Sequence, residues 1–546
     1  MFQELTSSTP KQITRPERLI TLCLLPLFLF ALSFAARIWF FYGFILGDDS
    51  LEFGVNMVIS QYGPNFGDNF QYRFTVWLFN VLFFKLFKIS EFTFFLPTWL
   101  MSASLSPIGY FLLLRWGYRR REALLGGLLM ATAPFEILLG TVRANDLILS
   151  WFLALSLLVF WFFEHRPKLQ GELLAVLLWL AFYTKLWTIY FFPALGLYYL
   201  IRFFRYKEWR GAAAFTSRSF LLHSITAAFW KLKAGSYLPF LYAYSATYPY
   251  PKSDLPELFR VWPRMIFKGS EFGTTLFGVI PYFLVVLVLI KIIFSIKSIM
   301  EPTAMALDRI DKYLIVYYLS FFLLLNYFPT NFKFDQYYSV PRIFRYLGPI
   351  SFPMVLHVAK MLLDLFRSLP TRVSVQPYLA SAIFIPFFIV NLWQTDEATR
   401  PGKIYQKALF QVVSEIKKKC PPQLLAESWL AFFLNEIYLK DACPGLPIVP
   451  VPVLDPGWAN EYEKWLDKTD STLPEGTLLI SGLGSYLHYG CHVCGFRLTQ
   501  FSHPLPDHWK LVKEYDMLSY LPSPEPARLW RLSKGAEAAL STGTPP

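Results

Sequence analysis

The chain has 546 residues, of which 55% are hydrophobic and only 16% are charged, and its mean hydropathy is +0.38. Soluble domains carry roughly 25% charged residues, so this composition excludes a soluble globular protein and indicates a protein that crosses a membrane several times. The net charge of +13 comes mostly from Lys and Arg in short clusters between apolar runs. That pattern follows the positive-inside rule and does not indicate nucleic-acid binding.

The N-terminus resembles a signal peptide, because Lys11, Arg15 and Arg18 precede a long apolar run. The run continues through Arg37 to Leu46, which is too long for the apolar region of a signal peptide. We therefore expect an uncleaved first membrane helix with its basic N-terminal flank in the cytoplasm.

The apolar segments predict an all-α polytopic membrane protein with about 11 spanning helices and further interfacial helices. The predicted spans are 19–46, 93–114, 122–141, 147–163, 171–186, 188–203, 218–241, 274–297, 312–328, 343–366 and 377–393. The segment 74–87 is short and contains Lys85, so we expect an interfacial or re-entrant helix there.

The basic loops give a consistent orientation if 74–87 does not cross the membrane. The cytoplasmic loops are then marked by Arg115–Arg121, His165–Lys168, Arg202–Arg210, Lys291–Arg309 and Arg367–Arg372. The predicted outer side carries the loops 47–73, 141–147, 184–188, 242–273 and 328–346, and everything after about residue 394. The polar residues that are suited to chemistry therefore gather on one side of the membrane.

The last part of the chain is less apolar and rich in Pro, which predicts a small extracytoplasmic α/β domain over 396–546 after a membrane domain over 1–395. Within it, 404–418 has the pattern of an amphipathic helix and 477–480 that of a strand.

Four of the five cysteines lie in this predicted domain, at Cys420, Cys443, Cys491 and Cys494, whereas Cys23 lies in the first span. An even number of cysteines in an oxidising compartment is typical of disulfides, although the pairing cannot be read from the sequence. Zinc binding by the CxxC pair and nearby histidines is the alternative, and the absence of a second CxxC at zinc-finger spacing disfavours it.

The first candidate site is the acidic pair Asp48 and Asp49, which follows the first span directly. Carboxylates at the mouth of a membrane helix are costly, and one beside an acceptor hydroxyl can remove its proton. The alternative is a solvated loop in which Asp49 and Ser50 cap the next helix.

A second candidate site is Arg143-Ala144-Asn145-Asp146, at the predicted outer start of the fourth span. Asp146 alone is explained as a helix cap, and Arg143 alone as an interfacial anchor. Acids and a base that converge at one membrane surface are more suggestive of a site together than singly.

Several cations are also expected on the outer side. Lys185 is explained by default as a residue that extends to the interface, and it is also suited to bind a phosphate. Arg342 and Arg345 lie at the outer end of a helix, against the usual charge bias, so we expect an anionic partner such as a lipid phosphate. Arg73 is a weaker candidate of the same kind.

These residues together predict a membrane cavity with outward acids and cations, suited to a lipid-phosphate-linked donor. A lipid or sugar transporter or flippase is the alternative. It requires charges deep in several spans and paired broken helices, for which only Lys231 and Lys233 offer a hint. A non-catalytic scaffold is a third possibility, disfavoured by the clustering of outward charges.

Several stretches resemble the GT-C glycosyltransferases, in particular the bacterial relatives of protein O-mannosyltransferases and aminoarabinose transferases. Asp48-Asp49 is similar to the acidic motif of their first external loop. Five further matches follow in order over about residues 40–360. They are Lys88–Phe92 with Leu96-Pro97, Arg120–Gly126 with Ala131–Pro134, Val142–Asp146, Leu180–Lys185, and Arg345–Pro349 with Pro353. The sequence departs from the family pattern at Asp49 (commonly Glu), Phe94-Phe95 (in place of Arg) and Leu186 (in place of Gly).

The resemblance implies roles for the candidate residues. Asp48 is expected to be the catalytic base, with Asp49 as its partner and Asp146 shaping the site. Lys185, Arg342, Arg345 and Arg73 are expected to contact donor phosphate, and Arg143, Asn145 and Tyr346 to line the substrate cavity. The expected partners are a polyprenyl-phosphate sugar and a glycan, lipid or protein acceptor. No cofactor is certain, although Asp48 and Asp146 are suited to hold Mg²⁺ or Mn²⁺ if a metal is used.

Overall fold

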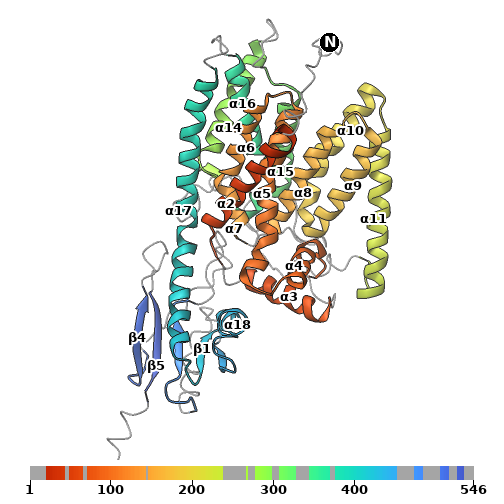
Figure 1. Cartoon of the computed structure of the whole chain (residues 1–546). Coiled ribbons are helices and arrows are strands. Elements are labelled where there is room, and N and C mark those ends of the chain that lie inside the picture. Colours follow the sequence, from red (N-terminus) through yellow and green to blue (C-terminus); the bar gives the residue numbers. More distant parts are fainter. Residues whose placement is uncertain are drawn as a thin grey trace, which may run out of the picture.

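The computed structural model describes residues 20–43, 48–64, 71–142, 145–237, 266–267, 277–297, 306–327, 344–368, 376–451, 472–483, 505–515 and 526–533. Within this part of the chain the protein is mostly helical, with a small sheet at its C-terminal end (Figure 1).

The helices before residue 240 begin with the π-helical turn η2 (Ile20–Leu24) and helix α2 (Leu25–Trp39). They continue with α3 (Asp48–Tyr62), α4 (Phe74–Leu86), α5 (Glu91–Arg115), α6 (Arg120–Ala131), α7 (Pro134–Thr141), α8 (Asn145–Phe162), α9 (Pro167–Thr184), the 3₁₀ helix η3 (Leu186–Phe191), α10 (Phe192–Tyr206) and α11 (Arg210–Ala234).

The later helices are α14 (Ile280–Lys297), α15 (Arg309–Tyr327), the 3₁₀ helix η4 (Phe344–Leu347), α16 (Gly348–Ser368), α17 (Gln376–Lys418), α18 (Ser428–Phe433) and the π-helical turn η5 (Leu434–Tyr438). The described part of the chain therefore has helices at the 11 predicted spans, together with the short helix α4 at 74–87.

Length and hydropathy alone identify fewer spans. Among the described residues, four helices are long and apolar enough to cross a membrane, or five if the bent pair α6 and α7 forms one span. The count of about 11 spans and the orientation therefore stay predictions. Helix α4 has 13 residues, too few to cross a bilayer on its own.

A buried arginine fixes the break between α6 and α7, whose axes differ by 50°. Arg37, at the end of α2, donates to the carbonyl of Ala131 at 2.8 Å and to Ser102 Oγ at 2.9 Å. Ser102 in turn donates to the carbonyl of Glu136 at 2.9 Å, so one network satisfies backbone groups on both sides of the break. The bent pair is thereby tied to the helix that leads to Asp48.

The described residues of the C-terminal region form a five-stranded mixed sheet, which confirms the predicted C-terminal α/β region. Its strands are β1 (Leu424–Glu427), β2 (Ile448–Val451), β3 (Leu478–Ser481), β4 (Trp509–Tyr515) and β5 (Ala527–Leu532). Their order is β2-β1-β3-β5-β4, with β1 parallel to β2 and β3, and β5 antiparallel to β3 and β4. The strand predicted at 477–480 corresponds to β3.

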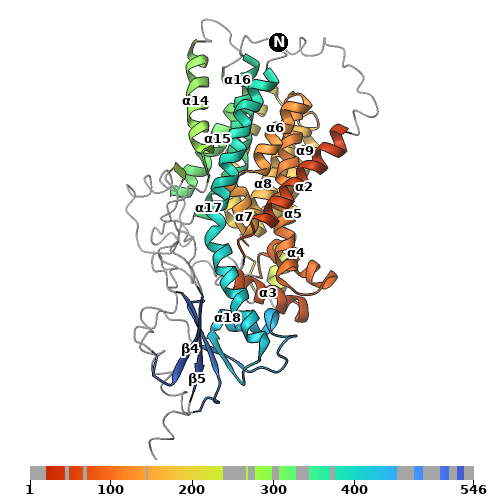
Figure 2. The ribbon, with the colours of Figure 1, turned by 60° about the vertical axis from the view of Figure 1, so that its left-hand side comes forward.

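Helix α17 joins the bundle to the sheet (Figure 2). It has 43 residues, and at about 1.5 Å per residue it is about 65 Å long, roughly twice the thickness of a bilayer core. The amphipathic helix predicted at 404–418 is its C-terminal part. Because α17 runs unbroken across residue 395, the domain boundary predicted there stays a prediction.

Among the described residues, the two largest of four clusters of buried hydrophobic side chains follow this arrangement. The larger fills the helix bundle. The second is shared between the end of the bundle and the C-terminal region, since it contains Phe53 and Phe94 together with Val412, Leu424 and Ile480. A disulfide between Cys420 and Cys443 closes the segment between α17 and β2. Cys23 is free, and Cys491 and Cys494 lie outside the described residues.

Candidate active site

The candidate site is built around an ion pair between α8 and the end of α9. Lys185 Nζ donates to Asp146 Oδ1 at 2.6 Å, and the side chains are 6% and 1% exposed. Asp146 lies in the first turn of α8, where a negative charge is favoured by the helix dipole. Lys185 has extended backbone between α9 and η3, so its side chain leaves the helix axis and reaches α8.

Two aromatic rings enclose the ammonium group of Lys185. Its nitrogen lies 4.0 Å from the centre of the Tyr346 ring and 4.6 Å from that of Trp187. The rings touch each other, with centroids 3.9 Å apart. Cation–π contacts of this kind contribute about 0.5–2 kcal/mol and exclude water from one side of the cation.

Helix α16 begins directly against this ion pair. A Cβ on Gly348 would lie 3.5 Å from Asp146 Cβ and 3.1 Å from Ser150 Oγ, so the backbone there approaches α8 closely. Glycine at this position lets η4, which carries Tyr346, pack beside the start of α8.

Helix α4 closes the same end of the bundle. The hydroxyls of Thr75 on α4 and Thr184 on α9 lie 2.8 Å apart and are both buried. Thr184 precedes Lys185, so the short helix predicted as interfacial contacts the residue beside the ion pair. Helices α3 and α4 lie at the end of the bundle that faces the sheet (Figures 1 and 2).

The structure thus brings together three of the predicted site residues, Asp146, Lys185 and Tyr346, with the buried Asn145 beside them. Helix α3 begins at Asp48, which places Asp48 and Asp49 in its first turn, but their side chains lie outside the described part. Arg143, Arg342 and the side chain of Arg345 also lie outside it. Arg73 precedes α4.

Trp187 is a site residue that the sequence analysis missed. An aromatic two residues after Lys185 was a usable signal, but the chain contains 17 tryptophans, and most of them read as interfacial residues.

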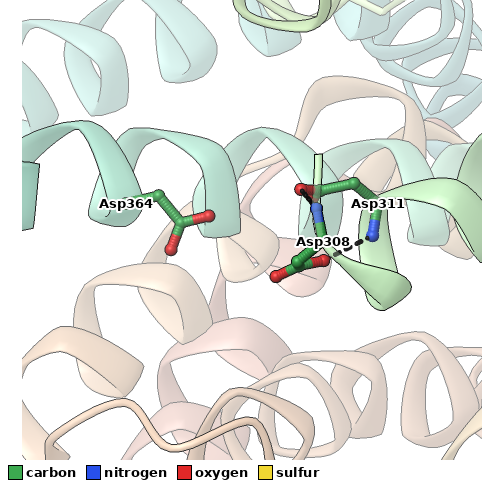
Figure 3. A group of neighbouring side chains, drawn as sticks. All are labelled: Asp308, Asp311 and Asp364. Atoms are coloured by element: carbon green, nitrogen blue, oxygen red, sulfur yellow. Dashed lines mark hydrogen bonds between the residues drawn. The ribbon is translucent and has the colours of Figure 1, made fainter. Parts of the chain in front are cut away.

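A separate acidic group consists of Asp308 just before α15, Asp311 in its first turn and Asp364 on α16. Ligand atoms of Asp308, Asp311 and Asp364 all lie within 4.8 Å of one another, a spacing that could hold a metal ion (Figure 3). Lys291 and Lys360 already contact these carboxylates. Lys291 Nζ lies 2.7 Å from Asp311 and 2.6 Å from Asp364, and Lys360 Nζ lies 2.7–2.9 Å from all three acids.

This acidic group is distinct from the candidate active site. Asp364 lies 16 residues after Gly348 on α16, about 24 Å along the helix. Lys291, which the sequence analysis assigned to a cytoplasmic loop, lies within α14 and is 1% exposed. The two lysines balance most of the carboxylate charge. The group is therefore explained as an ion-pair network without a metal ion.

The sequence analysis named Asp48 and Asp146 as possible metal ligands, and of these two the structure describes the side chain of Asp146. One of its oxygens accepts the hydrogen bond from Lys185. A cation bound there would have to share the carboxylate with an ammonium group, which fits a metal poorly and an anion bound to Lys185 better.

No model of a protein family and no curated protein sequence matches the chain. The structure is similar to that of ArnT from Cupriavidus metallidurans in the apo state, with a TM-score of 0.50, 12% identity, and coverage of 84% of this chain and 92% of that one. It is equally similar to ArnT bound to undecaprenyl phosphate, with a TM-score of 0.50, 11% identity, and coverage of 94% and 98%.

A weaker likeness is to the Archaeoglobus fulgidus oligosaccharyltransferase in complex with zinc and sulfate, with a TM-score of 0.48, 11% identity, and coverage of 83% and 67%. The likeness to ArnT extends over the helix bundle and the C-terminal region together, because it covers 94% of this chain. The chain therefore has a fold similar to that of ArnT, which agrees with the fold expected from the resemblance of its sequence to the GT-C glycosyltransferases.

Proposed function

We propose that the protein is a membrane glycosyltransferase that moves a sugar from a polyprenyl-phosphate donor to an acceptor hydroxyl. The observation that carries this proposal is the buried Lys185–Asp146 pair with its aromatic walls, at the end of the bundle where α3 begins with Asp48. A buried cation shielded from water is suited to an anionic headgroup. ArnT, which has a similar fold, has been crystallised with undecaprenyl phosphate.

In the proposed reaction the acceptor oxygen attacks the anomeric carbon of the sugar, and the bond from that carbon to the phosphate oxygen breaks. The acceptor proton passes to the carboxylate of Asp48, and the polyprenyl phosphate leaves with the bonding electrons. Lys185, together with Arg342 and Arg345, stabilises the charge on the departing phosphate.

Asp146 prepares Lys185 for this role. The carboxylate pairs with the buried ammonium group and fixes its direction, and the Tyr346 ring limits its movement on the other side. An ammonium group has three donors, so it can bind Asp146 and a phosphate oxygen at once. The positive-inside pattern of the loops supports a reaction on the outer face of the membrane.

The test is an assay of the purified full-length protein, reconstituted in lipid vesicles, with sugars linked to undecaprenyl or dolichyl phosphate. We expect release of the lipid phosphate together with transfer of the sugar to an added acceptor. Movement of intact donor across vesicles without cleavage of the sugar–phosphate bond would instead support a flippase and overturn the proposal.

A further inference from the structure

The segment that leads from α2 to Asp48 is held against helix α17. A Cβ on Gly43, whose φ is +92°, would lie 2.1 Å from the side-chain amide carbon of Gln406. A Cβ on Gly402 would lie 2.3 Å from the carbonyl oxygen of Tyr42. Glycine at 402 therefore lets α17 approach the backbone of Tyr42, and glycine at 43 permits the positive φ beside the Gln406 side chain.

Gln406 also takes part in a partly buried bridge at the start of α5. Its amide Nε2 donates to Glu91 Oε1 at 2.9 Å, and Tyr438 of η5 donates to Glu91 Oε2 at 3.1 Å. One carboxylate therefore joins the bundle to two elements of the C-terminal region. We call Glu91, Gln406 and Tyr438 the docking triad.

The segment after Asp48 also contacts the C-terminal region. Phe53 of α3 is fully buried, and its ring centroid lies 5.3 Å from that of Phe94 in the bundle. The rings of Phe432 and Phe433 in α18 lie 6.1 Å and 5.4 Å from the Phe53 ring. Helix α3 is thus packed between the bundle and the C-terminal region.

From these contacts we infer that the C-terminal region positions Asp48 for catalysis, and that Gln406 and Tyr438 are its positioning residues. The chain is fixed at Gly43 and again at Phe53, each five residues from Asp48. Residues of the C-terminal region make contacts at both points. This inference rests on the proposed transferase function, because it assigns Asp48 as the acting carboxylate.

The kinetic test uses the full-length protein with the double substitution Gln406→Ala and Tyr438→Phe. We expect kcat for sugar transfer to fall about tenfold to 100-fold, since a misplacement of about 1 Å can cost that much. The affinity for undecaprenyl phosphate and the KM for the donor should stay unchanged, because Lys185 lies on other elements. Gln411→Ala, an exposed substitution one turn further along α17, is the matched control and should leave kcat unchanged.

Exchanging the two polar partners provides a rescue. Glu91→Gln combined with Gln406→Glu restores an amide–carboxylate hydrogen bond with the roles reversed. We expect this pair to recover most of the activity that Gln406→Glu alone loses. A uniform loss of donor affinity and kcat in the docking-triad variants would show a general folding defect and overturn the positioning role.

Hydrogen exchange separates this inference from the proposed function. In the Gln406→Ala and Tyr438→Phe variant, backbone amides of α3 should exchange faster than in the wild type, whereas those of α8 should not change. Unchanged exchange in α3 would refute the inference. If the wild type transfers no sugar, the proposed function fails, and the exchange result still decides whether the C-terminal region holds α3.

Discussion

Lys185 and Asp146 form an ion pair across 2.6 Å in which neither side chain is more than 6% exposed. Burying two charges is costly, and a well-packed apolar pair of the same volume is often as stable. The proposed binding of a donor phosphate requires the positive charge of Lys185, which an apolar pair would lack.

Substitution of Lys185 by Met should both weaken the protein and remove donor binding. It leaves the Asp146 carboxylate buried without its ammonium partner, at a cost of about 3–5 kcal/mol in the free energy of unfolding. The double substitution with Asp146→Asn should recover most of this stability but not the affinity for undecaprenyl phosphate. Thermal unfolding in detergent and a lipid-phosphate binding assay measure the two effects, and unchanged donor affinity in the stable double variant would exclude Lys185 from phosphate binding.

Asp48→Asn should abolish transfer while the protein still inserts into the membrane and binds the lipid phosphate. The amide cannot accept the acceptor proton, so we expect a loss of about 100-fold or more in kcat with little change in donor affinity. Asp507→Asn, in an exposed turn of the C-terminal region, is the control. Full activity of the Asp48 variant would remove Asp48 from the mechanism.

Glu91 should make the docking of the C-terminal region sensitive to pH. Burial raises the pKa of the Glu91 carboxyl above its ordinary value of 4.5, against the hydrogen bonds from Gln406 and Tyr438, which lower it. The unfolded chain releases this proton at its ordinary pKa and the folded chain only at a higher one. The contribution of the protonated Glu91 carboxyl to the free energy of unfolding is therefore complete below pH 4.5. It is lost as the pH rises through the raised pKa.

Thermal unfolding of the wild type and of Glu91→Gln between about pH 4 and about pH 8 measures this effect. The difference in unfolding midpoint between the two proteins should shift in favour of Glu91→Gln as the pH rises, because the amide does not ionise. Glu475→Gln, an exposed substitution in the turn before β3, should show no such trend. Parallel curves for wild type and Glu91→Gln would contradict the prediction.

The stability of the ion-pair network on α14, α15 and α16 should depend on its carboxylates and not on a bound metal. Asp311→Asn removes a fully buried partner of Lys291 and Lys360, so we expect a loss of about 3–5 kcal/mol in the free energy of unfolding. Asp308→Asn, whose side chain is 47% exposed, should cost less. A chelator should leave the unfolding midpoint of the wild type unchanged, and a midpoint that falls with chelator and recovers with Mg²⁺ or Mn²⁺ would show a metal site instead.

The disulfide between Cys420 and Cys443 should stabilise the C-terminal region. It spans 23 residues, a separation for which loss of the cross-link costs about 3 kcal/mol. Cys420→Ser with Cys443→Ser should therefore increase proteolysis of the region around β1 and β2, with Cys23→Ser as the control. Equal protease resistance would show that packing alone holds this segment.

The arrangement of the site was only partly predictable from sequence. The side of the membrane predicted for Asp146, Lys185 and Tyr346 followed from the alternation of basic loops, and the structure brings the three together. The 2.6 Å contact depends on the extended backbone at Lys185 and on the close approach of Gly348. No hydrophobic period encodes these two features, so they could not be predicted.

The docking triad and the buried network were harder to foresee. Glu91 appeared in the sequence analysis only as part of a family motif, because its partners Gln406 and Tyr438 lie in the C-terminal region, far along the chain. Lys291 was assigned to a cytoplasmic loop because it is a basic residue near other basic residues. Only the packing of three helices shows that it is buried. Both sets of contacts join segments that are far apart in the sequence. The local sequence pattern of each segment predicts only a helix and says nothing about its partner.

The docking triad also sets an order of assembly during synthesis. Gln406 and Tyr438 lie 315 and 347 residues after Glu91, so the ribosome completes the bundle up to α16 before either partner exists. The first helices therefore enter the membrane before the contacts of Glu91 with Gln406 and Tyr438 can form. Contacts between residues so far apart in the sequence form slowly. A chain that stops before residue 406 would carry Asp48, Asp146 and Lys185 yet lack the contacts from Gln406 and Tyr438. Under the proposed positioning role, we expect such a chain to be inactive until the C-terminal region has been made.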